Sequence, residues 1–108
     1  MADIKARVKV PSTAAKGEII EIKTMIAHDM ESGQRKDKSG KVIPRQIINK
    51  FTCSLNGKEV FRSDWYTAVS ANPYLSFFLR ASESGTFDFA WHDDNGSIYK
   101  ASAPITVS

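Results

Sequence analysis

Apolar and polar residues alternate with a period of two along most of this chain. No segment carries an apolar stripe of helical periodicity over three turns. Successive side chains of a β-strand point to opposite faces, so this alternation is typical of half-buried strands. In residues 86–92, the clearest case, Phe87, Phe89 and Trp91 are predicted to lie in the core while their neighbours face solvent. The pattern predicts an all-β chain.

Seven segments show this alternation, and turn-forming residues separate them. The dipeptide Asn56-Gly57 predicts a two-residue hairpin turn, and residues 93–96 predict another. Residues 13–17 are also expected to be a turn. The predicted strands cover residues 4–10, 18–27, 46–55, 58–65, 74–81, 86–92 and 98–107. This spacing predicts one domain over residues 1–108, an immunoglobulin-like antiparallel β-sandwich of about seven strands.

The composition fits a globular protein, since 42% of the 108 residues are hydrophobic and 25% are charged. The sequence has no apolar run of about 18 residues, so no membrane span and no membrane partner are predicted. Residues 1–10 alternate charged and apolar residues and lack the apolar core of a secretory signal. Taken alone, that feature indicates the cytoplasm.

A single cysteine, Cys53, cannot form a disulfide within the chain. It lies on the apolar side of the alternating positions 47, 49, 51, 53 and 55, so we expect a buried thiol that packs as a small hydrophobic group. A disulfide with another chain is the alternative.

Charge concentrates in the polar segment 28–45, which separates two predicted strands. Residues 35–45 hold five basic residues and one acidic residue, a local charge of +4, while the whole chain carries +3. A function that depends on charge is therefore expected here. The candidate residues for docking a partner, or for holding an anion, are Arg35, Lys36, Lys41 and Arg45.

Two interpretations of this segment remain open. It is a solvated hairpin tip, or it binds an anionic ligand or an acidic protein surface. Residues 42–44 (Val-Ile-Pro) favour the second interpretation, because a loop that is only exposed to solvent needs no apolar patch. The segment holds no aromatic residue for stacking on bases, so no nucleic-acid partner is predicted.

The outer face of one sheet is a second candidate. In an immunoglobulin-type strand order, strands 18–27 and 74–81 are neighbours. The large apolar residues left outside would be Ile19, Met25, Tyr74 and Phe78. Such a cluster is typical of a partner interface. The alternative is that a bulge turns one set inward or that a loop covers the face.

The two histidines, His28 and His92, are each followed by aspartate at the end of a predicted strand. One interpretation joins them in a His/Asp metal site or an active site. The other is two solvated loop histidines, because such sites usually have more nitrogen or sulfur ligands. With no phosphate-binding loop and no serine-elbow motif, we predict that the chain is not an enzyme and binds no cofactor and no metal.

The sequence His28-Asp-Met-Glu-Ser-Gly-Gln-Arg-Lys-Asp37, followed by Ile43-Pro-Arg-Gln-Ile-Ile48, resembles the SoxZ family. SoxZ is the smaller subunit of the SoxYZ carrier complex of bacterial sulfur (thiosulfate) oxidation. The resemblance extends over nearly the whole chain. Further matching segments are Lys16-Gly-Glu-Ile-Ile-Glu-Ile-Lys23, Phe51-Thr-Cys53 and Asn56-Gly-Lys58.

This resemblance implies an immunoglobulin-like fold and a non-catalytic scaffold subunit. Its partner would be a SoxY-type subunit that holds covalently bound sulfur intermediates on a cysteine arm, in a heterodimer or a higher oligomer. The resemblance also implies transient contacts with periplasmic Sox enzymes. It further implies a periplasmic location, which the chain would reach by being exported together with a partner that carries the signal peptide. Cys53 lies in a predicted strand and is not the carrier thiol.

The isolated chain is expected to self-associate through its apolar face. A different class of function also remains open. In it the chain would be a basic β-sandwich binding module for an anionic ligand or a metal, unrelated to sulfur oxidation.

Overall fold

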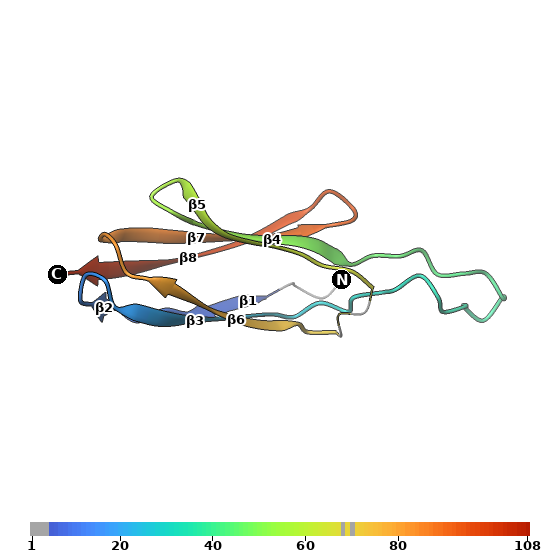
Figure 1. Cartoon of the computed structure of the whole chain (residues 1–108). Helices are drawn as coiled ribbons and strands as arrows, with labels where there is room; N and C mark the ends of the chain where they lie inside the picture. Colours follow the sequence, from blue (N-terminus) through green and yellow to red (C-terminus); the bar gives the residue numbers. More distant parts are fainter. Residues whose placement is uncertain (1–4, 68, 70) are drawn as a thin grey trace.

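The computed structural model describes residues 5–67, 69 and 71–108, which form eight strands in two stacked sheets (Figure 1). The small sheet has the order β1-β3-β6 and the large sheet the order β2-β8-β7-β4-β5. The strands are β1 (Ala6–Lys9), β2 (Thr13–Ala14), β3 (Ile19–Ile26), β4 (Ile48–Leu55), β5 (Lys58–Asp64), β6 (Tyr74–Arg80), β7 (Gly85–Asp93) and β8 (Ile98–Val107). The predicted all-β sandwich is confirmed.

One strand was missed by the sequence pattern. Strand β2 lies where a turn was predicted, and it pairs in parallel with the end of β8. Two residues are too few to show alternation, so only the tertiary pairing reveals this strand. The predicted start of the first strand, Ile4, lies outside the described residues.

The core is centred on Phe51 in β4. Its ring lies 5.2 Å from the ring of Trp91, 6.2 Å from that of Phe89 and 5.9 Å from that of Phe77 in the opposite sheet. Aromatic rings at these separations attract one another through offset and edge contacts as well as through burial. The predicted core residues Phe87, Phe89 and Trp91 are all buried.

The start of β4 departs from simple alternation. Ile47 and Ile48 are both fully buried, and the register against β7 shifts between Ile48 and Lys50. A bulge of this kind places two successive residues against one on the partner strand. Asn49, predicted to share the inner face with Phe51, is therefore only half-buried and bonds to the β7–β8 turn instead.

Residues 31–46, here called the arm, project beyond the sandwich as a two-stranded ribbon (Figure 1). Isolated bridges pair Glu31 with Gln46 and Lys36 with Val42. The described residues measure 59 Å along their longest axis and 23 Å along the next. Val42 is 58% exposed near the tip. The polar segment of the sequence is thus a protruding hairpin.

Candidate binding surfaces

The outer face of the small sheet carries all four apolar residues predicted to lie there. Strands β3 and β6 are antiparallel neighbours, as predicted. The alternation turns odd-numbered residues of β3 and even-numbered residues of β6 outward. The exposed fractions are 54% for Ile19, 41% for Met25, 59% for Tyr74 and 65% for Phe78. Within the residues that the structure describes, no bulge or loop covers these four side chains.

The four side chains form two pairs and not one cluster. Met25 lies directly opposite Tyr74. Ile19 and Phe78 are diagonal neighbours at the other end, because Ile19 pairs with Arg80 while Phe78 pairs with Glu21. A polar row separates the two pairs, and it consists of Lys9, Lys23 and Ser76.

This face is also basic. Within its three strands, four basic side chains and one acidic side chain, Glu21, point outward, which gives a net charge of +3. The basic residues are Arg7, Lys9, Lys23 and Arg80. The polar segment is therefore not the only place where basic side chains gather. This second surface could not be recognised in the sequence, because its basic residues come from three separate strands.

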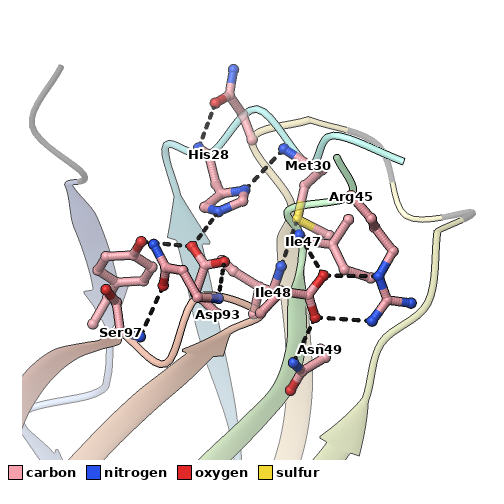
Figure 2. Close-up of polar contacts among 12 residues, drawn as sticks. His28, Met30, Arg45, Ile47, Ile48, Asn49, Asp93 and Ser97 are labelled. Carbon is pink, nitrogen blue, oxygen red and sulfur yellow. Dashed lines mark hydrogen bonds and ion pairs between the residues drawn. The ribbon is translucent and has the colours of Figure 1, made fainter. Parts of the chain in front are cut away.

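The arm is held at its root by Asp93, the last residue of β7. The Asp93 carboxylate accepts hydrogen bonds from His28 Nε2 at 2.8 Å and from the Tyr99 hydroxyl at 2.6 Å (Figure 2). The Met30 backbone N–H donates to His28 Nδ1 at 2.9 Å, so the proton of the neutral ring lies on Nε2. The His28 and Asp93 side chains are 4% and 0% exposed. This contact ties the outgoing strand of the arm to the large sheet.

The next residue, Asp94, holds the returning strand. Its carboxylate accepts two hydrogen bonds from the Arg45 guanidinium, one from Nε at 2.8 Å and one from Nη2 at 2.9 Å. It also accepts the Ile47 backbone N–H at 3.1 Å and Asn49 Nδ2 at 2.9 Å. Two consecutive carboxylates thus anchor the two strands of the arm, and we call them the arm clamp.

Both clamp carboxyls have a pKa below the usual value of 3.8. Burial opposes ionisation in each case, but hydrogen bonds to the carboxylate outweigh it. Tyr99 and His28 supply those bonds to Asp93, and Asn49 and Arg45 supply them to Asp94.

The tip of the arm is organised by Asp37. Its Oδ1 accepts the backbone N–H groups of Ser39 and Lys41 at 2.9 and 3.0 Å, and the Ser39 hydroxyl at 2.7 Å. These hydrogen bonds hold the Asp37 pKa below its usual value. The acid in the basic segment is therefore used to fold the tip.

The four predicted arm residues divide into two kinds. Arg35 bonds to Glu31, and Arg45 bonds to Asp94. Among the described residues, Lys36 and Lys41 form no ion pair within the chain, and the same holds for Lys38 between them. The arginines shape the arm, and the three lysines present its charge to solvent.

The two histidines do not come together. His28 points into the sandwich, whereas His92 pairs with Lys50 and Ile98 and points to the outer face of the large sheet. The expectation that His28 is solvated is wrong. Burial first, then Lys50 and Arg62, lower the His92 pKa. Within the described ranges, no group of three or more His, Cys, Asp or Glu side chains could hold a metal ion.

Cys53 lies in β4 between β5 and β7 and is fully buried, as expected for a packing residue. Burial, with a smaller contribution from the charge of Asp88, raises its pKa to about 12. The thiol therefore stays protonated at neutral pH.

Comparison with known proteins identifies a family and a fold. The model of the family described as sulphur oxidation protein SoxZ matches residues 8–104. A superoxide reductase (neelaredoxin) from Ignicoccus hospitalis is 14% identical, with a TM-score of 0.73 over 95% of this chain and 80% of that one. The sulfur carrier protein SoxY from Chlorobium limicola is 12% identical, with a TM-score of 0.63 over 95% and 78% of the two chains.

At these identities, the solved structures show the shared sandwich fold alone. The search of curated proteins found no match. In the part of the chain that the structure describes, no helix is long and apolar enough to cross a membrane.

We predict that Asp94→Ala loosens the returning strand of the arm without unfolding the sandwich. The change removes the acceptor for Arg45, Asn49 and the Ile47 N–H, so amide exchange at Ile47 should accelerate about tenfold or more. Hydrogen exchange read by NMR measures this. Asp88→Ala, at an exposed position of β7, is the control and should leave the arm amides unchanged. Equal effects of the two variants would contradict the clamp.

Acid should destabilise the protein through the clamp. Because the pKa of Asp93 is lower in the folded state than its usual 3.8, its stabilising contribution is complete above that value. It is lost as the pH falls through the folded-state pKa. Denaturant unfolding at a series of pH values should therefore show a smaller loss below about pH 4 for Asp93→Asn than for the wild type. Parallel pH profiles would show that Asp93 contributes nothing to acid sensitivity.

Proposed function

The chain belongs to the SoxZ family of sulphur oxidation proteins, and from that membership we propose that it is the non-catalytic, partner-binding subunit of a SoxYZ-type carrier complex. The observation that carries the proposal is the extent of the family match, which includes nearly all of both sheets. In such a complex the partner subunit holds sulfur intermediates on a cysteine arm during thiosulfate or sulfur oxidation. This chain would supply the scaffold.

The chemistry of the described side chains supports a scaffold role. Cys53 is buried, with a pKa raised to about 12, so it is neither exposed nor ionised as a nucleophile must be. His28 uses both ring nitrogens in hydrogen bonds that hold the arm. Cys53 and His28 are thus committed to packing and to hydrogen bonds within the fold.

The partner surface that we propose is the outer face of the small sheet. Ile19, Met25, Tyr74 and Phe78 expose large apolar side chains there. A permanent heterodimer buries such groups, since obligate interfaces resemble a domain core cut in half. SoxY from Chlorobium limicola has a similar sandwich fold, so the complex would join two related sandwiches.

The arm is the surface that we propose for transient contacts. It protrudes beyond the end of the sandwich (Figure 1), and its lysines Lys36, Lys38 and Lys41 are exposed. Arg35 and Arg45 set its shape, and Lys36 and Lys41 add positive charge near acidic surfaces of visiting enzymes or near oxyanions on the partner's cysteine arm. Charge of this kind raises association rates more than it raises affinity.

Family membership also supports a periplasmic location, which is typical of Sox proteins. We propose that the chain is exported together with its signal-bearing partner. Fractionation of cells that lack the partner's signal would test this, because the chain should then remain in the cytoplasm.

Phe78→Asp should abolish the complex with the SoxY-type subunit while leaving the fold intact. Phe78 is 65% exposed, so the change costs little in the isolated chain but buries a carboxylate in the interface. Co-purification and native mass measure the complex, and thermal unfolding measures the fold. Ile98→Asp is the matched control, because Ile98 is a 48% exposed apolar residue of the large sheet. A complex that survives Phe78→Asp unchanged would rule out this face.

Reversing the charge at the arm tip should slow the reconstituted pathway. With Lys36→Glu and Lys41→Glu together, we expect thiosulfate turnover to fall about tenfold at low salt and little at high salt, where charges are screened. The control is Lys16→Glu with Lys58→Glu, which changes the net charge equally at the other end of the sandwich, in the turn before β3 and at the first residue of β5. Undiminished turnover at low salt would eliminate the docking role.

A further inference from the structure

We propose that the outer face of the small sheet selects a protein partner whose contact surface has acidic residues around apolar side chains. The four basic side chains of this face would also prevent two copies of this chain from pairing through it. This inference rests on the proposed function, because it concerns the same face. It adds what the partner must look like.

The strand registers fix the pattern that a partner would meet. Arg7, Met25 and Tyr74 form one row across the three strands. Two residues further along β6, the next outward-facing row is formed by Lys9, Lys23 and Ser76. Beyond it, Glu21 faces Phe78, and Ile19 faces Arg80. Each apolar pair therefore has an arginine beside it, and the basic row lies between the two pairs.

The opposite outer face of the molecule lacks this charge. Three basic and three acidic side chains of the large sheet's strands point outward, so the charges balance. They are Lys50, Arg62 and Lys100 with Glu59, Asp64 and Asp88. Solubility alone would not require a different charge on the two sheets. The +3 charge thus coincides with the face that exposes the apolar pairs.

A second copy is a poor occupant of this face. A two-fold pairing brings the same surface patch against itself. Four basic side chains would then meet four others, with one Glu21 from each copy to offset them. Juxtaposed like charges cost several kcal/mol across an interface. We therefore expect an isolated monomer, in place of the self-association that the apolar residues alone suggest.

Nucleic acid is the other polymer that basic and aromatic side chains could attract. Two features favour a protein. Ile19 and Met25 offer aliphatic contact area that phosphates and base stacking do not use. Glu21 would repel a phosphate backbone beside Phe78, one of the two aromatic side chains on this face.

The test measures the dissociation constant of the complex with the SoxY-type subunit of the same organism across a salt series. Arg7→Glu with Lys9→Glu should weaken the complex about tenfold at low salt and flatten its salt dependence. Arg7→Gln with Lys9→Gln should have an intermediate effect. Arg7 and Lys9 are exposed and make no side-chain hydrogen bond or ion pair in the described residues, and thermal unfolding checks that both variants fold.

The matched control is Arg62→Glu with Lys100→Glu, which makes the same substitutions on the large sheet's outer face. It should leave the dissociation constant within about twofold of the wild type. Similar losses from both pairs of changes would overturn the inference. So would a wild-type dimer that Phe78→Asp dissociates, or tight binding of a single-stranded oligonucleotide that Arg7→Glu with Lys9→Glu abolishes.

The two proposals fail in different ways. If Phe78→Asp leaves the complex intact, the face is not the interface and the proposed site itself is lost. If Phe78→Asp abolishes the complex but reversing Arg7 and Lys9 has no effect, the interface stands and only the requirement for an acidic partner is removed.

Discussion

The position of the arm depends on the hydrogen bond between His28 and Asp93. A buried carboxylate is costly unless donors surround it, and Asp93 obtains one of its two short side-chain bonds from the residue at which the arm leaves the sandwich. If the arm moved away, the buried Asp93 carboxylate would lose the His28 donor and keep only Tyr99 as a side-chain donor. Asp94 extends the same constraint to the returning strand, where Arg45 and the Ile47 amide are its donors. A protruding ribbon with few internal bridges is thereby oriented from its base.

The fold could be predicted because side-chain alternation is a local property. The inward set that includes Phe87 and Phe89, and the outward set that includes Ile19 and Phe78, both follow from a period of two. The features that the sequence did not predict depend on contacts between residues far apart in the chain. His28 and Asp93 are 65 positions apart, and nothing near His28 in the sequence indicates that it is buried. The bulge at Ile48 likewise appears only when β4 is aligned with β7.

The same distinction explains the charges. A count along the sequence finds the arm, because its five basic residues lie within eleven consecutive positions, 35–45. It does not find the basic face, because Arg7, Lys23 and Arg80 alternate with apolar residues on three strands and meet only through sheet pairing. The molecule thus presents two basic surfaces of different character. One is the outer face of the small sheet, which also exposes two apolar pairs, and the other is a protruding tip with exposed lysines.

The depth of Cys53 has a consequence for a complex that carries sulfur. Thiolates attack disulfides and persulfides, and the rate depends on the ionised fraction and on access. Cys53 has neither, since its side chain is fully buried and its pKa is raised to about 12. A scaffold with a reactive thiol would intercept the cargo that its partner holds. In the proposed carrier complex, Cys53 would therefore not react with sulfur that the partner subunit holds.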